Sequence, residues 1–167
     1  MNMAAMLRQS RWLLISAVIV ALDLWTKSLA VANLDYAQPV TLLPVLDFTL
    51  LYNYGAAFSF LSTAGGWQRW LFTFIALSVS VVLVIWILRL DRKEQWLTIS
   101  LALILGGAVG NLYDRMTLGY VVDFIHFHWN NRYFPAFNIA DAAISVGAVM
   151  MLIDAFWLQK RREAPSS

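Results

Sequence analysis

Four long apolar runs, separated by polar segments, dominate the sequence. They lie at about residues 12–32, 67–88, 96–113 and 139–158. A helix needs roughly 20 apolar residues to cross the hydrocarbon core of a bilayer, and each run is about that long. We therefore expect a membrane all-α bundle of four transmembrane helices, forming a single integral membrane domain over residues 1–167.

Lys and Arg residues gather in the flanks of these runs, within residues 8–11, 89–93 and 160–162. With four spans, all three clusters lie on the same side of the membrane. The excess of Lys and Arg in cytoplasmic flanks identifies that side as the cytoplasm. Both termini are then cytoplasmic, and residues 33–66 and 114–138 form two outer segments.

The first outer segment contains another apolar stretch, residues 45–61, which is a possible fifth span. Adding this span would move the clusters at 89–93 and 160–162 to the outer side, so the distribution of Lys and Arg argues against it. Residues 47–54 instead alternate apolar and polar side chains, with one break at Leu51. This period of two predicts a small β-containing segment on the outer surface.

The composition supports a membrane protein. Of the 167 residues, 60% are hydrophobic and 13% are charged, whereas soluble domains carry about 25% charged residues. The chain has no cysteine, which excludes disulfides and thiol catalysis. Its net charge of +2 is too small to indicate a nucleic-acid partner.

Asp23 and Lys27 lie one helical turn apart inside the first apolar run. Side chains at i and i+4 face each other, and pairing offsets part of the cost of burying either charge. The pair also argues against a cleaved signal peptide, whose apolar region would not end in a charge pair. Two interpretations stay open: a structural ion pair, or a pair that orients a group at the outer end of the helix.

Small and polar residues mark the outer part of the third run. Gly106, Gly107 and Gly110 have the spacing that lets helices approach closely. Asn111 lies one turn before Arg115 on the same helix. Arg115 could extend towards the membrane interface, or it could brace a carboxylate.

Two isolated acids, Asp123 and Asp141, are the main candidates for chemistry. Asp123 lies in the apolar stretch YVVDFI, outside the spans, and Asp141 lies at the start of the fourth run. Asp141 follows Asn138 by three residues, so it could also complete a helix capping box. The segment between the two acids has to loop back, which could bring the carboxylates together.

Two neighbouring carboxylates do not both ionise easily, so they share a proton and titrate as a pair. Such a pair can activate a water molecule and hydrolyse a peptide bond without a metal ion. A helix N-terminus favours negative charge. We therefore expect Asp141 to be the ionised partner and Asp123 to carry the proton.

The chain has two histidines, His126 and His128, which a strand would place on one face. A zinc enzyme needs three protein ligands, and Asp123 could supply the third. The sequence contains no H-E-x-x-H pattern. We expect two water-exposed interfacial histidines and no metal or other cofactor.

Several of these blocks together resemble the bacterial lipoprotein signal peptidase family, also called type II signal peptidases. The blocks are DLWTK with Asp23 and Lys27, NYGAAFS at 53–59, GGAVGNLYDR at 106–115, VVDF at 121–124 and FNIAD at 137–141. Each block alone is weak, but five in this order with four spans are specific. The resemblance covers nearly the whole chain.

The resemblance implies an aspartic endopeptidase of the bacterial inner membrane, with its active site near the periplasmic face. It would cleave lipid-modified prolipoproteins before the lipidated cysteine. On that pattern Asp123 and Asp141 are the catalytic pair, while Asp114 and Arg115 brace the rim of the site. The supporting and substrate-contacting positions are Asn53, Gly55, Asn111, Arg115 and Asn138, with Asp23 and Lys27 as further supporting residues.

We expect a monomer that contacts membrane lipids and precursor substrates and binds no nucleic acid. The alternative is a non-enzymatic protein, a small proton-coupled transporter or scaffold that uses intramembrane acids as a relay. That alternative predicts acids near the bilayer midplane that face a cavity. Only Asp23 lies so deep in the sequence pattern, and Lys27 is available as its partner.

Overall fold

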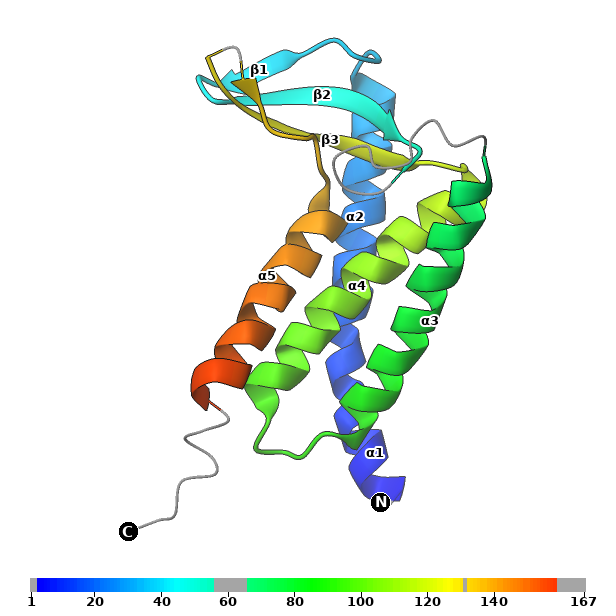
Figure 1. Cartoon of the computed structure of the whole chain (residues 1–167), viewed down its shortest axis with the longest axis vertical. Coiled ribbons are helices and arrows are strands. Elements are labelled where there is room, and N and C mark those ends of the chain that lie inside the picture. The colour runs from blue at the N-terminus through cyan, green and yellow to red at the C-terminus, as the bar shows by residue number, and fades with distance from the viewer. Residues whose placement is uncertain (1–2, 56–65, 131, 159–167) are drawn as a thin grey trace.

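A bundle of long helices carries a small β-sheet across one end (Figure 1). The structure is a computed structural model that describes residues 3–55, 66–130 and 132–158. Within these ranges, four helical segments are long and apolar enough to cross a membrane: Met6–Asn33, Trp67–Arg89, Gln95–Thr117 and Ile139–Leu158. The predicted combination of four such helices and a small sheet is confirmed.

The helical elements follow one another with short connections, except where the sheet intervenes. In chain order they are α1 (Met3–Gln9), the 3-10 turn η1 (Ser10–Trp12), α2 (Leu13–Asn33), α3 (Trp67–Arg89), α4 (Gln95–Thr117), α5 (Ile139–Ile153) and the π-helical turn η3 (Asp154–Leu158). The first span therefore combines the end of α1, from Met6, with η1 and α2, and the fourth combines α5 with η3.

Helix α4 lies at the centre of the bundle and packs against α2, α3 and α5. Glycines permit this close approach. A Cβ atom at Gly107 would overlap the carbonyl oxygen of Ala140 in α5, and one at Gly110 would lie 2.6 Å from Oδ2 of Asp23 in α2. The close helix packing predicted from the glycine spacing is confirmed.

The third span is longer at its C-terminal end than the sequence predicted. Helix α4 continues to Thr117 instead of ending near Tyr113, so Asp114 and Arg115 lie on the helix and not in the outer segment. The apolar run stops before the helix does, because the polar side chains of the last turns find partners inside the protein.

The sheet is antiparallel, with the strand order β1-β2-β3-β4. Its strands are β1 (Val40–Leu43), β2 (Leu46–Asn53), β3 (Val121–Trp129) and β4 (Arg132–Tyr133). The register of β2 against β3 shifts between Phe48 and Leu51, where the sequence alternation breaks. The possible fifth span is thus a strand over residues 46–53, and its residues 56–61 lie outside the described ranges.

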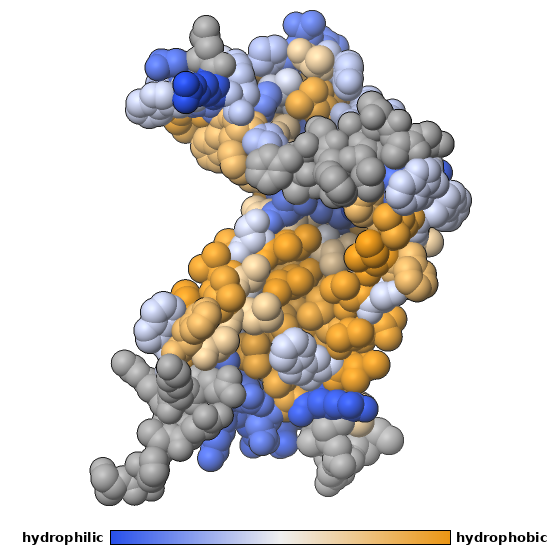
Figure 2. All heavy atoms as spheres, viewed as in Figure 1, coloured by the Kyte–Doolittle hydropathy of each residue, from blue (hydrophilic) through white to orange (hydrophobic). Residues whose placement is uncertain are grey.

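On the face shown in Figure 2, hydrophobic residues cover the middle of the helical bundle, and hydrophilic residues gather towards the two ends of the molecule. On α3, Phe74 is 68% exposed and Val82 is 60% exposed. Large apolar side chains on the outside of a bundle are what contact with lipid requires. The surface therefore supports a multi-pass membrane protein.

Candidate active site

A cavity of about 1040 Å³ lies between the sheet and the adjoining ends of α4 and α5. Its walls include Asn53 from β2, Asp123 from β3, Asn111 and Arg115 from α4, and Asp141 from α5. The two candidate carboxylates therefore face one space, although 18 positions separate them in the sequence. Five of the predicted site residues meet here.

Asp123 is held in place by strand pairing and by two amides. It pairs with Leu51 across the β2–β3 ladder and is 3% exposed. Asn138 donates from Nδ2 to Asp123 Oδ1 at 2.8 Å, and Asn53 donates from Nδ2 to Oδ2 at 3.1 Å. Burial, together with the negative charge of Asp141, raises the pKa of the Asp123 carboxyl to about 7.

Asp141 occupies the first turn of α5 and forms a capping box with Asn138. The Asp141 N–H donates to Asn138 Oδ1 at 2.9 Å, and the Asn138 N–H donates to Asp141 Oδ2 at 3.3 Å. Asn111 donates from Nδ2 to the other oxygen, Oδ1, at 2.7 Å. The predicted capping role is confirmed, and the same carboxylate also faces the cavity.

Asn138 connects the two carboxylates. It is fully buried, and its Nδ2 lies 2.8 Å from Asp123 Oδ1 and 3.1 Å from Asn111 Oδ1. Through Asn111 and its own backbone it also fixes Asp141. One side chain thus controls the position of β3 relative to the start of α5.

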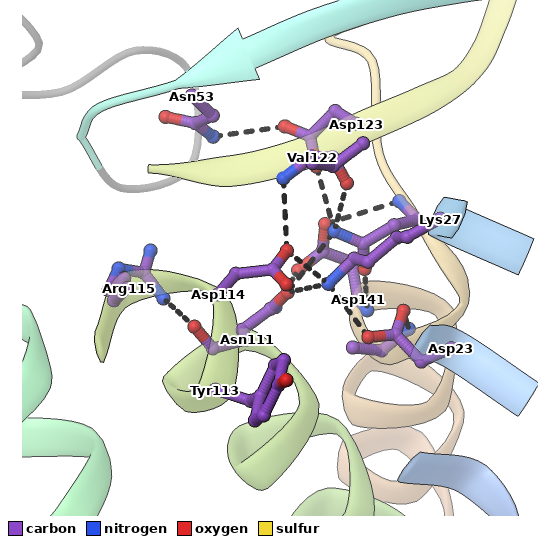
Figure 3. Close-up of polar contacts among 12 residues, drawn as sticks. Asp23, Lys27, Asn53, Asn111, Tyr113, Asp114, Arg115, Val122, Asp123 and Asp141 are labelled. Carbon is purple, nitrogen blue, oxygen red and sulfur yellow. Dashed lines mark hydrogen bonds and ion pairs between the residues drawn. The ribbon is translucent and has the colours of Figure 1, made fainter. Parts of the chain in front are cut away.

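Lys27 lies at the centre of a buried charge cluster next to these residues (Figure 3). Its Nζ atom is 2.7 Å from Asp23 Oδ2, 2.9 Å from Asp114 Oδ2 and 3.0 Å from Asn111 Oδ1. The three contacts match the three N–H donors of an ammonium group. Both carboxylates are almost completely removed from solvent, so the cluster is a connected polar network inside the bundle.

The same carboxylates hold the backbone beside each candidate catalytic residue. Asp23 Oδ1 accepts a hydrogen bond from the Ala140 N–H at 2.9 Å, next to Asp141. Asp114 Oδ2 accepts one from the Val122 N–H at 3.1 Å, next to Asp123. The structural interpretation of the Asp23–Lys27 pair is confirmed, and Asp23 also contacts the backbone at the start of α5, where the second interpretation expected the pair to act.

The position predicted for Asp114 was wrong. The sequence indicates a place at the rim beside Arg115, but Asp114 is 3% exposed on α4 and pairs with Lys27. Asn111 and Asp114 are three residues apart, and i and i+3 positions share a helix face. That spacing could have indicated the role, had the helix been extended beyond Tyr113.

Arg115 lines the cavity without a direct ion pair to a carboxylate in the described part of the chain. It donates from Nη2 to the carbonyl oxygen of Gly55 at 3.1 Å, and no carboxylate among the described residues lies within ion-pair distance of it. Gly55 in turn donates its N–H to Asn53 Oδ1 at 3.0 Å. The remainder of the NYGAAFS block, residues 56–59, lies outside the described ranges.

The two histidines are less exposed to water than predicted. His128 Nε2 lies 3.4 Å from Oδ1 of the buried Asp47, and its side chain is 15% exposed. His126 Nδ1 lies 3.3 Å from Thr49 Oγ1, and the Tyr133 ring packs against both imidazoles. Burial lowers the pKa of His126. In the described part of the chain, no group of three His, Asp or Glu residues could hold a metal ion.

Comparison with known proteins connects this geometry to one family. Residues 15–157 match the family described as signal peptidase (SPase) II. The chain is 58% identical to a lipoprotein signal peptidase of Acinetobacter baumannii over 151 residues, which are 90% of this chain and 86% of that protein. It is 56% identical to one from Pseudomonas aeruginosa over 155 residues, which are 92% of each.

Two solved structures described as bacterial membrane enzymes have a similar fold. The first has a TM-score of 0.82 at 26% identity, and the match covers 95% of this chain and 94% of the chain in that structure. The second has a TM-score of 0.77 at 28% identity and covers 89% of this chain and 94% of its own.

Proposed function

This chain belongs to the signal peptidase II family, and we propose that it removes the signal peptides of lipid-modified prolipoproteins by aspartic peptidase chemistry. Cleavage falls before the lipidated cysteine, and Asp123 and Asp141 are the catalytic pair. The observation that carries the assignment is the shared cavity, where the two buried carboxylates face one space and amide donors hold each of them.

The two carboxylates divide the proton transfers. With a pKa of about 7, Asp123 carries a proton near neutral pH, while Asp141 lies at a helix N-terminus that favours negative charge. Asp141 takes a proton from water as the water oxygen attacks the scissile carbonyl, and Asp123 donates its proton to the carbonyl oxygen. Asp141 then protonates the leaving amine, and Asp123 recovers its proton as the carbonyl re-forms.

The other residues hold this pair in register. Asn53, Asn111 and Asn138 donate to the carboxylates. Lys27 connects Asp23 and Asp114, which hold the backbone on either side of the site. Preorganised groups of this kind lose little energy to reorganisation during the reaction.

The surroundings of the cavity suit a lipid-anchored peptide. A diacylglyceryl cysteine is held at the membrane interface, so its scissile bond arrives at the depth where the sheet meets the helices. Val40, Leu42 and Leu43 on β1 are 53–56% exposed, which favours a sheet that rests on the membrane surface. An extended peptide can add to such a sheet by backbone hydrogen bonding.

The proposed location is the bacterial inner membrane, with both termini in the cytoplasm and the site near the periplasmic face. The protein acts as a monomer in this proposal. Because the chain contains no cysteine, single cysteines at Asp91 and Asn130 provide a clean test. An impermeant thiol reagent applied to intact cells should label position 130 and not position 91, and labelling at 91 would contradict the topology.

The transporter alternative receives no support. It required an intramembrane acid that faces a cavity, but Asp23 is fully buried and lies 2.7 Å from Lys27. The acids that do face a cavity lie where the sheet meets the helices.

The decisive experiment incubates the purified protein with a lipidated lipobox peptide and with the same peptide lacking the lipid. We expect cleavage before the cysteine of the lipidated peptide and little cleavage of the other. Absence of cleavage by a folded protein would refute the proposal. Equal cleavage of both peptides would refute the lipid requirement alone.

A further inference from the structure

Helix α3 contributes no residue to the walls of the cavity, yet it holds the end of α4 that does. Arg69, in the first turn of α3, donates from Nε to the Arg115 carbonyl oxygen at 2.8 Å and from Nη2 to the Met116 carbonyl oxygen at 2.8 Å. The last carbonyls of a helix lack partners within the helix and form its negative end. A guanidinium at this place satisfies two of them at once.

The side chain of Arg115 is held by the same helix. Its guanidinium carbon lies 5.5 Å from the centre of the Phe72 ring, one helical turn after Arg69. Arg69 thus fixes the backbone of Arg115, and Phe72 supports its side chain. Helix α3 therefore positions one residue of the cavity wall, Arg115, by direct contact.

From Arg115 a chain of hydrogen bonds continues to Asp123. Arg115 donates to the Gly55 carbonyl oxygen at 3.1 Å, and the Gly55 N–H donates to Asn53 Oδ1 at 3.0 Å. Asn53 then uses Nδ2 to donate to Asp123 Oδ2 at 3.1 Å. The contact to Gly55 fixes the amide of Asn53, because the turn between them closes on the Asn53 side chain.

We propose that Arg69 is a positioning residue for Asp123, acting through Arg115, Gly55 and Asn53. The inference rests on the proposed function, because it takes Asp123 as one of the catalytic pair. Its consequence is that a helix outside the cavity sets the geometry of the reaction. Substitution of Arg69 should loosen the Asn53–Asp123 hydrogen bond without touching the cavity itself.

The titration of Asp123 separates this role from simple capping of α4. The Asn53 hydrogen bond lowers the pKa of Asp123, whereas burial and the charge of Asp141 raise it. Lys27 and Asn138 also lower it and do not contact Arg69. A loosened Asn53 amide therefore raises the pKa of Asp123 further, whereas the loss of a helix cap alone would reduce stability and leave this titration unchanged.

The test compares Arg69→Gln with Arg89→Gln, an exposed arginine at the other end of the same helix. In the full-length protein with the lipidated lipobox peptide, Arg69→Gln should lower kcat by roughly 3- to 10-fold, less than the ~10²-fold of a 1 Å misplacement. It should also move the alkaline limb of the rate–pH profile to higher pH, as Asn53→Ala should. Arg89→Gln should match the wild type in both measurements.

The double variant Arg69→Gln with Asn53→Ala provides a further comparison. If the relay exists, its profile should coincide with that of Asn53→Ala, because residues in one network are not additive. Additive shifts, or a wild-type profile for a folded Arg69→Gln variant, would overturn the inference while leaving the proposed function intact. If the folded wild-type protein did not cleave the lipidated peptide at all, the proposed function itself would be refuted.

If Arg69→Gln does not fold, Arg69→Lys decides the matter. Lysine keeps the charge but lacks the paired donors of the guanidinium. A shift of the alkaline limb, matched by the carbon-13 titration of the Asp123 carboxyl, supports the relay. Reduced stability with an unchanged titration refutes it.

Discussion

Helices α3 and α4 have the same length of 23 residues but opposite relations to the rest of the protein. The more apolar α3 is the more exposed, with 17% of its most apolar 18-residue window buried, whereas 61% of the corresponding window of α4 is buried. In a soluble protein the more apolar helix would instead be the more deeply buried one. Lipid is as apolar as the side chains that face it, so hydropathy in a membrane protein indicates contact with lipid and not membership of the core.

The less apolar helix carries the polar groups of the site. Asn111, Asp114 and Arg115 lie in the last two turns of α4, each with a partner outside that helix. Polar groups inside a membrane protein are costly unless they are paired. The polar end of α4 is therefore stable only because α2, α5 and the backbone of Gly55, just after β2, supply those partners.

The prediction with the largest expected effect tests whether Asp123 and Asp141, which face the cavity beside α4, carry out the chemistry. Asp123→Asn and Asp141→Asn keep the volume but remove a group that transfers protons. General acid–base catalysis contributes typically 10²–10⁴-fold, so each variant should lose at least about 100-fold in kcat. The double variant should be little worse than either single one, because the pair acts as a unit. Near-wild-type cleavage by either folded variant would refute the assignment.

The prediction with the next largest effect tests how much the buried ion pair between Lys27 and Asp114 contributes to stability. Asp114→Asn removes one partner of a buried ion pair, a change that costs roughly 3–5 kcal/mol where no other partner remains. Asp23 stays beside Lys27, so we expect a loss at or below that range in detergent unfolding experiments. Asp91→Asn is the exposed control and should change stability little. Equal stability of the two variants would show that the Lys27–Asp114 pair contributes nothing.

A third prediction concerns the close packing of α4 against α5, a feature that distinguishes α4 from the lipid-facing α3. Gly107→Ala forces a methyl group against the Ala140 carbonyl oxygen, directly before Asp141. Overpacking of this kind costs about 1–3 kcal/mol, and activity should fall with it because the start of α5 is displaced. Leu77→Ala on α3, where the side chain is 51% exposed, should have a much smaller effect on both. A larger effect at Leu77 would contradict the lipid-facing assignment of α3.

The fourth prediction follows from the burial of Asp123. Its folded pKa of about 7 lies above the unfolded value, so its stabilising contribution is present below about pH 4 and is lost as the pH rises through 7. Asn resembles the protonated form. The amide costs one of the two hydrogen bonds that Asp123 accepts at every pH, so the prediction concerns the difference between pH values: the melting temperature of Asp123→Asn relative to wild type should be higher at pH 8 than at pH 4 by roughly 2–8 °C, taking ~1–2 kcal/mol and about 2–4 °C per kcal/mol. An equal shift at both pH values would contradict the raised pKa.

The sequence predicted the spans because each depends on local composition over about 20 residues. It also indicated strand β2, whose break in alternation at Leu51 coincides with the shift of register against β3. Asn138 and Asp141 could be recognised as a cap because their contacts are three residues apart. In each case the decisive interaction is short in sequence.

The predictions failed where contacts cross between distant segments. Asp114 could not be paired with Lys27 from the sequence, since 87 positions separate them and nothing local indicates that α4 continues. Asp47 and His128 are likewise 81 positions apart, and their contact depends on the β2–β3 register. Which polar groups meet inside the bundle is decided by packing, which a single sequence does not encode locally.

The smallest expected effect concerns the far end of the sheet. His128 lies five residues beyond Asp123 along β3, or about 17 Å at ~3.4 Å per residue, and its partner is Asp47 and not a member of the proposed catalytic pair. His128→Gln should therefore keep kcat within about twofold, and chelators should leave cleavage unchanged, because the proposed mechanism uses carboxylates alone. Stability should fall slightly, by roughly 1 kcal/mol or less, since a neutral amide can still donate to Asp47.

His126→Gln tests the neighbouring position in the cavity wall and should behave similarly. Loss of activity with EDTA that zinc restores would contradict the carboxylate mechanism.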